Sequence, residues 1–468
     1  MSPLPFLLRR LKELRLIEEA QTQALVRDGI VTLPDLEMAI AEDRPAAASA
    51  SLRRIAVPFR EELRTFSLGR ALDILDPLLA AIAAAYPDVR GLEPTGAVRR
   101  AEPLITTLTV VGCTSQPSDA VDAVAGLPIL SGVIYRASRR LLVLFERHEV
   151  DIRFTTADDY GTLLFTTTGP PSHVAAVQKR RGMRLSASET EVYTHAGLAY
   201  LPPQVRDSAD AIEAAATRQI PRLVQREDIR GDLHMHTSYS DGRDSLRRMV
   251  MEAHALGYEY IAITDHSEHA GASRTVTPSD LARQLDEIDA LRDDAYGLTI
   301  LQGLEVDILP DGELDCPDAV LARLDIVLAS LHDAAGHGRQ RLTERCLAAI
   351  RHPLVSVITH PGNQLVGHRP PYDMDYDAIY AAAAETGTAL EIDGAPSHLD
   401  LDGARAREAV RAGVTLVVDS DCHRAHALDR QMWMGVGTAR RGWVESRHVL
   451  NTRPVDEVVA FVARKRGR

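Results

Sequence analysis

Histidine and carboxylate residues stand at the ends of many apolar runs in the second half of the chain. His234 and His236 lie one residue apart at the end of a run that starts at Gly231. Other residues of these types end further runs: Asp265-His266, Glu305, His332, His360, Glu391 with Asp393, and Asp421 with His423. Imidazoles and carboxylates from many strands converge in few architectures, and the commonest is a parallel barrel whose strand C-termini share one face.

These residue types point to bound metal ions. Alternate residues of a strand lie on the same face, so His234 and His236 can share an ion. Imidazole together with carboxylate suits Zn, Mn or Fe better than Mg or Ca, which prefer oxygen ligands. The candidate ligands are His234, His236, Asp241, His266, Glu305, His332, His360, Asp421 and His423. Because one ion needs fewer, we expect two or three ions with a bridging carboxylate, a cluster that activates water and neutralises phosphate oxygens.

Each part of this set has a simpler explanation when it is taken alone. A single His-x-His is more often structural than a ligand pair, and Asp265 could be a helix-capping residue beside a surface histidine, His266. The occurrence of all nine residues at strand ends favours metal binding. Six further histidines are expected on the surface or in the core: His254, His269, His337, His352, His426 and His448.

The elements that would position these residues alternate between strand and helix. The apolar runs are Tyr260–Thr264, Leu298–Leu304, Leu324–Leu331, Leu354–Thr359, Ala389–Leu390 and Val414–Ser420. Helices are expected near Ser245–Leu256, Pro278–Arg292, Arg341–Arg351, Tyr376–Thr386 and Ala404–Ala412. Alternation of this kind indicates a parallel α/β sheet or barrel.

The first half of the chain has a different pattern. Residues 1–45 have the periodicity of short helices with a turn at Gly29, and a small-residue segment follows at Ala46–Ala50. A strongly apolar helix is expected at Leu68–Tyr86. Strands are expected near Leu104–Val111, Gly132–Tyr135, Arg140–Phe145 and Val150–Phe154. The pattern predicts a small α+β domain, which a connector rich in Pro and Arg joins to the second half.

Size, charge and cysteine usage limit the classes of function. A chain of 468 residues is long enough for two or three domains. No apolar stretch is long enough to cross a bilayer, no secretion signal is recognisable, and the four cysteines lack disulfide or zinc spacing, so we expect a cytoplasmic protein. Nearly all of the net charge of −13 lies in the second half, which would not bind a polyanion by bulk attraction.

On these motifs, residues 231–468 resemble the PHP (polymerase and histidinol phosphatase) domain. The matching stretches are Asp232–Thr237, Ser240–Gly242, Thr264–Ser267, Gly303–Ile308, Ser330–His332, His360-Pro361 and Asp421–His423. The resemblance implies an α/β fold, a distorted (β/α)7 relative of the TIM barrel, with a site for three divalent ions (Mn, Zn or Fe). In the family pattern one ion takes His234, His236, Glu305 and Asp421, a second takes Asp241, His266 and His423, and a third takes His332 and His360 with Glu305 as bridge.

Other stretches resemble bacterial and archaeal family X DNA polymerases with a C-terminal PHP domain. They are Gly96–Arg100, Glu191–Arg206, Gly303–Asp315, Gly435–Trp443 and Val449–Arg453. The family places two aspartates, one residue apart, on the strand after the first of these stretches. This chain has Thr107 and Thr109 there, and Asp151, which matches a third carboxylate, is alone. One carboxylate cannot hold two Mg²⁺ ions, so we expect polymerase activity to be lost.

The resemblance also implies a division of the chain. Residues 1–60 are expected to be a helix-hairpin-helix-like remnant, matched at Leu16–Glu42, without the lyase-type domain and catalytic lysine of the family. Residues 61–200 would be a degenerate palm and thumb, with an altered nucleotide-contacting loop at Thr167–Pro171. Residues 201–230 would be a linker and residues 231–468 the PHP domain. The first half could be a scaffold that packs against or shields the barrel, or it could retain DNA binding.

Residues beside the metal ligands could bind substrate. An arginine on a loop over the metal face can hold a phosphate through two parallel hydrogen bonds, although an exposed arginine is usually only a solubilising charge. The candidates are Arg274, Arg369, Arg440 and Arg441. Asp265, next to His266, is expected to orient a neighbouring imidazole.

Four functions compete. The first is a phosphoesterase of the DNA-repair type that acts on nucleic-acid ends, as a 3′→5′ exonuclease or 3′-phosphatase. The second is a small-molecule phosphatase of the histidinol-phosphate type, favoured by the acidic second half and by Asn363-Gln364 and Asp393-Gly394, which depart from the polymerase subgroup. The third, a non-catalytic DNA-binding or complex-organising protein, is opposed by the complete ligand set. The fourth, an active polymerase, is opposed by Thr107 and Thr109.

Overall fold

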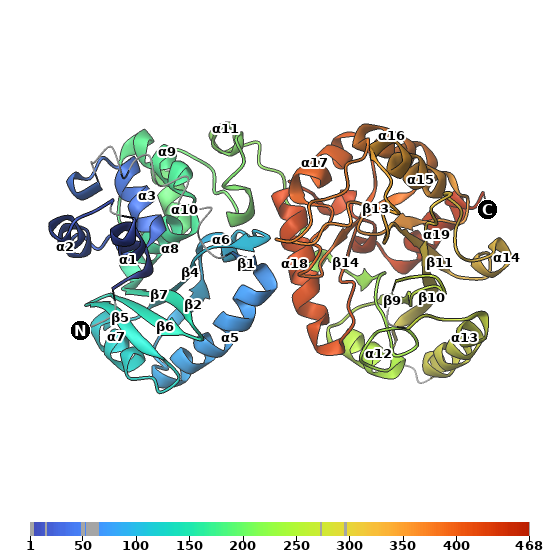
Figure 1. Cartoon of the computed structure of the whole chain (residues 1–468), viewed down its shortest axis with the longest axis horizontal. Coiled ribbons are helices and arrows are strands. Elements are labelled where there is room, and N and C mark those ends of the chain that lie inside the picture. The colour runs from blue at the N-terminus through green and yellow to red at the C-terminus, as the bar shows by residue number, and fades with distance from the viewer. Residues whose placement is uncertain are drawn as a thin grey trace. The chain divides into compact units, whose positions relative to one another are not determined.

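The computed structural model describes residues 4–14, 16–47, 52, 65–271, 274–293 and 297–467. The chain forms two compact units, Met1–Ile220 and Pro221–Arg468 (Figure 1). The expected boundary between residues 60 and 61, and most of the segment Ala46–Ala50, lie outside the described residues. The expected linker contains helix α11 (Ala211–Thr217), and Val224 and Ile229 from its second part pack in the core of the second unit.

Helices open the first unit, as the periodicity predicts. They are α1 (Phe6–Glu13), α2 (Glu19–Arg27) and α3 (Leu33–Ala41). Gly29 has a φ of 70°, which allows the tight turn before α3. The side chain of Thr32 accepts a hydrogen bond from the backbone of Asp35, and the carboxylate of Asp35 accepts one from the backbone of Thr32, which fixes the start of α3. Leucines of the three helices form a small core.

A five-stranded sheet of order β2-β4-β7-β6-β5 is the main element of the first unit. Its strands are β2 (Arg90–Pro94), β4 (Leu108–Cys113), β5 (Gly132–Ala137), β6 (Arg140–Phe145) and β7 (His148–Thr155). Strands β4 and β7 are parallel, and the other pairs are antiparallel. The expected strand Leu104–Val111 is split: β3 (Leu104–Ile105) pairs with β1 (Phe66–Ser67), and β4 joins the sheet.

Six helices accompany this sheet in the described part of the unit. They are α5 (Leu68–Ala85), α6 (Gly96–Arg99), α7 (Pro117–Ala125), α8 (Tyr160–Thr168), α9 (Pro171–Arg181) and α10 (Glu189–His195). The segment Thr167–Pro171, expected as a loop, is mostly helical: α8 ends at Thr168, and only Gly169 and Pro170 separate it from α9. The mixed α/β content agrees with the expected α+β class.

The second unit is a barrel of seven parallel strands in sequential order. The strands are β8 (Gly231–Asp232), β9 (Tyr260–Ile263), β10 (Thr299–Asp307), β11 (Ile326–Ser330), β12 (Val357–Ile358), β13 (Ala389–Asp393) and β14 (Leu416–Asp419). The barrel is nearly closed, because Met235 pairs with Cys422 and the backbone N–H of His236 donates to the carbonyl of Cys422 at 2.9 Å. This architecture confirms the expected (β/α)7 fold.

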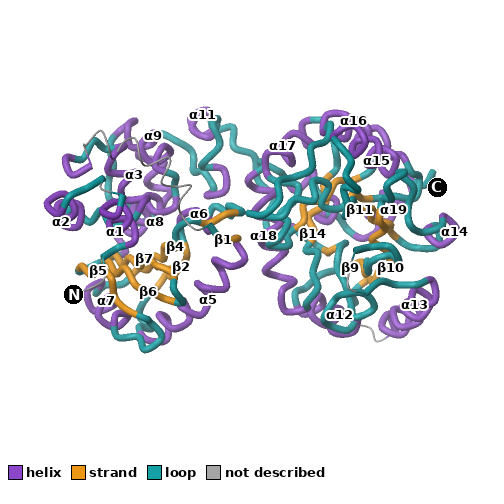
Figure 2. The backbone as a smooth tube through the Cα atoms, viewed as in Figure 1, coloured by secondary structure: helices purple, strands orange, loops and turns teal. Residues whose placement is uncertain are grey.

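Helices surround the strands of the second unit (Figure 2). They are α12 (Leu246–Ala255), α13 (Pro278–Asp293), α14 (Asp318–Leu321), α15 (Arg339–Arg351), α16 (Tyr376–Thr386), α17 (Gly403–Arg411), α18 (Leu428–Arg441) and α19 (Val455–Lys465). Among the described helices, none combines the length and apolar character that a membrane span requires.

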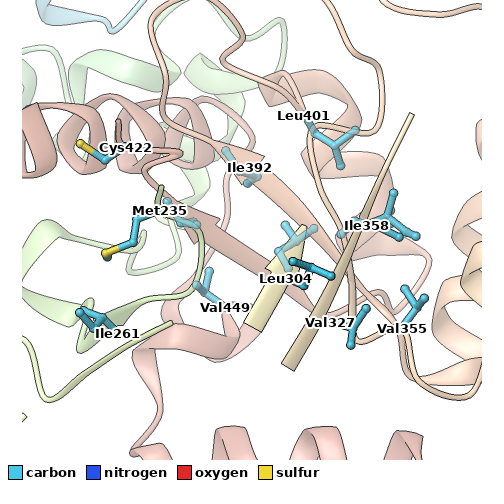
Figure 3. Packing of buried hydrophobic residues seen from close by; sticks show 14 of the residues in the cluster. Met235, Ile261, Leu304, Val327, Val355, Ile358, Ile392, Leu401, Cys422 and Val449 are labelled. Carbon is cyan, nitrogen blue, oxygen red and sulfur yellow. The ribbon is translucent and has the colours of Figure 1, made fainter. Parts of the chain in front are cut away.

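Alternate residues of the barrel strands belong to two separate apolar clusters. Leu304, Val327, Ile358 and Ile392 pack in the larger cluster, together with residues of the helices (Figure 3). The intervening positions form a second, smaller cluster, to which α19 contributes Val458, Phe461 and Val462. Farther along β13, the positions that continue the second cluster are polar: Ala389 is followed at intervals of two by Glu391 and Asp393. This period of two brings the polar side chains together at the strand C-termini.

Candidate metal centre

The nine predicted metal ligands come together at the C-terminal ends of the barrel strands. Glu305 lies in β10 and the other eight follow strands: His234, His236 and Asp241 follow β8, His266 follows β9, His332 follows β11, His360 follows β12, and Asp421 and His423 follow β14. Eight of the nine form three overlapping groups in which one ligand atom of each residue lies within 4.8 Å of the others. The ninth, His360, adjoins the third group, because its Nε2 is 2.9 Å from Glu305 Oε1.

Glu305 lies between two sets of imidazoles. Its Oε2 faces His234, His236 and His266, and its Oε1 faces His332 and His360, at nitrogen–oxygen distances of 2.8 to 3.5 Å. The side chain is fully buried. A carboxylate with different imidazoles at each oxygen has the arrangement of a bridge between ions, which is the role that the family pattern implies for Glu305.

A second carboxylate, Asp241, faces His423 and His266. Its Oδ1 is 3.2 Å from His423 Nε2 and 3.5 Å from His266 Nε2. The ring of His236 stacks between those two imidazoles, with centroids 4.2 and 4.3 Å away. Asp421 completes the remaining group, with Oδ1 3.0 Å from His236 Nε2 and 3.6 Å from His234 Nε2. These three groups overlap the family pattern without matching it residue for residue, since His236 joins the group of Asp241, and His266 joins the group of Glu305 and His332.

Several buried polar atoms of the centre have no hydrogen-bond partner in the described part of the chain. They are Glu305 Oε2, Asp241 Oδ1, His236 Nδ1, His266 Nδ1 and His360 Nδ1. Buried polar atoms are nearly always hydrogen-bonded, so this concentration calls for an explanation. Carboxylate oxygens and imidazole nitrogens that face one another without hydrogen bonds suit divalent cations. The residues present thus fit the metal ions that the PHP domain implies.

Charge in the centre shifts the pKa values of the imidazoles. Burial and the neighbours His423 and His266 lower the pKa of His236 to about 3, so the ring is neutral, as a metal ligand must be. Burial alone would lower the pKa of His332, but Glu305 and Asp307 outweigh it and raise the value to about 10. The same negative charge would attract a divalent cation in place of the proton.

Two further carboxylates hold imidazoles in place. His234 Nδ1 lies 2.7 Å from Glu391 Oε1, and the backbone N–H of His360 donates to Glu391 Oε2 at 2.6 Å. His332 Nδ1 lies 2.6 Å from Asp307 Oδ1. These contacts turn the Nε2 atoms of His234 and His332 toward Glu305. Neither carboxylate was predicted to orient an imidazole, although Glu305-Val306-Asp307 has the strand spacing that would have indicated Asp307.

The hydrogen-bond partners of Asp265 in the described part of the chain do not include an imidazole. Asp265 is fully buried, and its carboxylate accepts hydrogen bonds from the backbone and hydroxyl groups of Thr237 and Ser240 and from Gln284 Nε2. These donors bind both oxygens of the carboxylate. Asp265 instead fixes the turn that leads to Asp241.

The four arginine candidates lie in different surroundings. Arg274 is exposed between β9 and α13. Arg369 is half-buried and donates to the backbone and side-chain oxygens of Asn363, whose amide group donates to the carbonyls of Leu331 and His332. Asn363 therefore links Arg369 to the backbone of His332, one of the candidate metal ligands.

The positions of Arg440 and Arg441 do not support the expected phosphate contact. Both are at the end of α18, and Arg440 Nη1 donates to the carbonyl of Val224, in the segment that precedes β8. This hydrogen bond joins two parts of the barrel framework. The metal-ligand candidates, by contrast, follow the C-terminal ends of the strands.

Two of the ligand candidates have unusual backbone conformations. His360 and Asp421 have φ values of 26° and 48°, a region that residues other than glycine seldom adopt. Nearby Asn363, whose side chain holds the loop after β11, has a φ of 43°. Conformations of this kind persist where surrounding contacts enforce them, and they cluster at functional sites.

Comparison with known proteins agrees with this geometry. The family model described as the PHP domain matches residues 232–391. The DNA polymerase/3′-5′ exonuclease PolX of Bacillus subtilis (strain 168) is 36% identical over 420 residues, which cover 85% of this chain and 73% of that protein. The chain belongs to the PolX family, the family X DNA polymerases with a PHP domain. A PolX-family protein with this domain is a metal-dependent hydrolase of phosphate esters.

Smaller proteins also match part of this chain. A protein named probable phosphatase from Thermoanaerobacter sp. (strain X514) is 32% identical over 211 residues, which cover 42% of this chain and 81% of that protein. The solved histidinol phosphate phosphatase of Lactococcus lactis, complexed with zinc, L-histidinol and phosphate, matches with 19% identity and a TM-score of 0.35, over 45% of this chain and 91% of that one.

The first unit of this PolX protein places Thr109 on β4 opposite Asp151 on β7. Thr107, Thr109 and Asp151 line one cavity of about 490 Å³. Asp151 is buried and accepts hydrogen bonds from Arg140 Nε and Arg153 Nε, each at 2.8 Å. The same two arginines donate to Asp35 of α3, at 2.6 and 2.8 Å. Asp151 is therefore neutralised by a buried ion network.

Proposed function

We propose that this protein hydrolyses phosphate esters at DNA 3′ ends, as a 3′→5′ exonuclease or 3′-phosphatase. The nine candidate ligands would hold three divalent ions, Mn, Zn or Fe. The observation that carries the proposal is Glu305, buried between five imidazoles at nitrogen–oxygen distances of 2.8 to 3.5 Å. The relative from Bacillus subtilis, whose name includes 3′-5′ exonuclease, supports DNA as the substrate class.

Bound ions would activate a water molecule and neutralise the non-bridging oxygens of the phosphate. Other residues of the chain would hold the candidate metal ligands in position. Glu391 and Asp307 fix the rings of His234 and His332, and Asp265 fixes the turn that carries Asp241. Arg369 and exposed Arg274 are the arginines that we propose for phosphate binding.

Polymerase activity is proposed to be absent. Two threonines stand where the family places carboxylates, and the remaining Asp151 is paired with Arg140 and Arg153. Transfer to a 3′ end needs carboxylates that hold metal ions at the triphosphate. In this proposal residues 1–60 and 61–200 are remnants of the polymerase half, residues 201–230 connect it to the barrel, and residues 231–468 perform the hydrolysis.

A small-molecule phosphatase is the second candidate. It is favoured by the excess of acidic residues in the second half and by the similarity of the barrel to a protein named as a phosphatase. A purely DNA-binding or scaffolding role would leave the assembled ligand set without a use.

The two enzymatic candidates can be separated with one panel of substrates. The full chain, loaded with Mn²⁺, is incubated with 3′-labelled single-stranded DNA, a 3′-phosphate primer, a generic aryl phosphate and histidinol phosphate. We expect release of the 3′ label from the DNA or of phosphate from the 3′-phosphate primer. Turnover of the small esters alone would support the second candidate. No hydrolysis of any substrate with metal bound would contradict both. His254→Ala, an exposed position on α12, serves as the matched control for His234→Ala.

A further inference from the structure

A fourth group of metal-type side chains lies beside the nine residues already described. It consists of Asp393 at the end of β13, His398 in the following loop, and Asp421 after β14. One ligand atom of each residue lies within 4.8 Å of the others. Neither Asp393 nor His398 belongs to the set of nine, so the group adds two ligands to the centre and shares one with it.

Asp393 is a buried carboxylate with an unused oxygen. The residue is fully buried, and Oδ1 accepts a hydrogen bond from the backbone N–H of Ala395 at 2.5 Å. Its Oδ2 is buried and has no hydrogen-bond partner among the described residues. A buried carboxylate oxygen without a partner is costly, and a bound cation would satisfy it.

His398 also has a buried polar atom without a hydrogen-bond partner within the described residues. Its Nδ1 is buried and lacks a hydrogen-bond partner in the described ranges. The ring stacks on His360, with centroids 5.2 Å apart and planes at 23°, and Gln364 Nε2 donates to the backbone carbonyls of His398 and Leu399. The loop therefore holds the ring next to the third group of candidate ligands.

The two carboxylates at this position differ in their ion pairs. Asp421 has His234, His236 and His423 as its ion-pair partners, and these imidazoles also face the other groups. No lysine or arginine within the described residues forms an ion pair with Asp393. Two carboxylates that approach one another without a cation repel. A divalent ion between them would remove this repulsion and satisfy both unused atoms.

We propose that Asp393, His398 and Asp421 bind a fourth divalent cation, with Asp421 as the bridge to the ion held by His234 and His236. Two carboxylates and one imidazole suit Mn²⁺, Zn²⁺ or Fe²⁺. Three protein ligands leave further coordination positions, which a phosphate oxygen of the substrate can occupy. The inference concerns the number of ions, and it does not depend on which ester the protein hydrolyses.

Anomalous diffraction from crystals of the full chain soaked in MnCl₂, measured at the manganese edge, tests the proposal. We expect four peaks in the unchanged protein. Asp393→Asn and His398→Gln should each lose the peak beside Asp421 and keep the other three. His368→Gln, an exposed position in a neighbouring loop, should keep all four.

Peaks at the three other groups with none between Asp393 and His398 would overturn the fourth site and leave the proposed function standing. Absence of the three other peaks would contradict the proposed metal centre itself. Metal content measured by mass spectrometry gives a second readout that needs no crystals. A loss of about one ion per chain in both variants, but not in His368→Gln, supports the site, and equal metal content in all proteins overturns it.

Discussion

Thr109 lies directly opposite Asp151 in the parallel pairing of β4 with β7. In the polymerase-like half, a hydroxyl thus stands next to the one carboxylate that remains. Arg140 and Arg153 bind that carboxylate, and both also bind Asp35 at the start of α3. A position at which the family binds metal ions therefore has the contacts of a structural ion network that links the helical segment to the sheet.

This network predicts that restoring the missing carboxylates does not restore polymerase activity. In the double variant Thr107→Asp, Thr109→Asp, two carboxylates return, but Asp151 stays bound to Arg140 and Arg153. We expect no detectable nucleotide incorporation on a gapped duplex by the unchanged protein or by the variant, with an active polymerase as the positive control. Template-dependent extension by the unchanged protein would show that the polymerase half is functional.

Asp35 should make the stability of the first unit depend on pH. Burial would raise the pKa of Asp35, but Arg153 and Arg140 outweigh it and hold the pKa well below its usual range. A carboxyl group with a depressed pKa stabilises the folded state above its unfolded pKa of about 4, and this contribution is lost as the pH falls toward the folded pKa.

We therefore expect Asp35→Asn to lower the free energy of unfolding of the first unit by about 1.5–3 kcal/mol at pH 7, because it weakens the hydrogen bonds from Arg140 and Arg153, which keep Asp151 as a partner. The difference in unfolding free energy between Asp35→Asn and the unchanged protein should become smaller below about pH 4. Urea unfolding of the full chain at pH 7 and at pH 3.5, followed by circular dichroism, measures it. Asp28→Asn, an exposed position before Gly29, is the control. Equal unfolding midpoints for the two variants at pH 7 would contradict the account.

Glu391 should control metal affinity without being a ligand itself. Its two oxygens contact His234 Nδ1 and the backbone N–H of His360. Removing a hydrogen-bonded carboxylate behind a ligating imidazole typically weakens metal binding by about 10–100-fold. We expect a shift of that size in Glu391→Gln when Mn²⁺ binding is followed by calorimetry. Exposed Glu385→Gln provides the comparison, and identical affinities in the two variants would argue against the assigned role.

Asp265 is expected to act on folding and on the position of Asp241. An amide in its place would turn donors toward the groups of Thr237 and Ser240 that now donate to it. Leaving buried donors unsatisfied costs about 1–3 kcal/mol each. Asp265→Asn should unfold at lower temperature and retain less metal, whereas exposed Asp286→Asn should match the unchanged protein. If Asp265→Asn kept full stability and metal content, the turn would not depend on Asp265.

The barrel and the nine candidate ligands could be predicted from sequence because each depends on local patterns. Helix α16 has the expected bounds, and Glu305 ends up between imidazoles because every strand carries its polar residues at the same end. The orientation of side chains by distant partners could not be predicted. No local sequence pattern indicates that Asp265 accepts hydrogen bonds from Thr237 and Ser240, or that His398 stacks on His360. Both contacts depend on how the loops fold over the barrel.

In the polymerase-like half, contacts between distant residues could likewise not be predicted from the sequence. The replacement of two carboxylates by threonines could be seen in the sequence, but the pairing of Asp151 with Arg140 and Arg153 depends on the register of β6 and β7. The contact with Asp35 joins residues more than a hundred positions apart, so it depends on the packing of α3 against the sheet.

The central claim is that the metal centre of the barrel removes nucleotides or phosphate from DNA 3′ ends. The most direct measurement follows 3′-labelled single-stranded DNA with the Mn²⁺-loaded full chain and with His234→Ala. The account predicts release of label by the unchanged protein and none by His234→Ala. Intact DNA after incubation with metal-loaded protein, or undiminished release by His234→Ala, would contradict it.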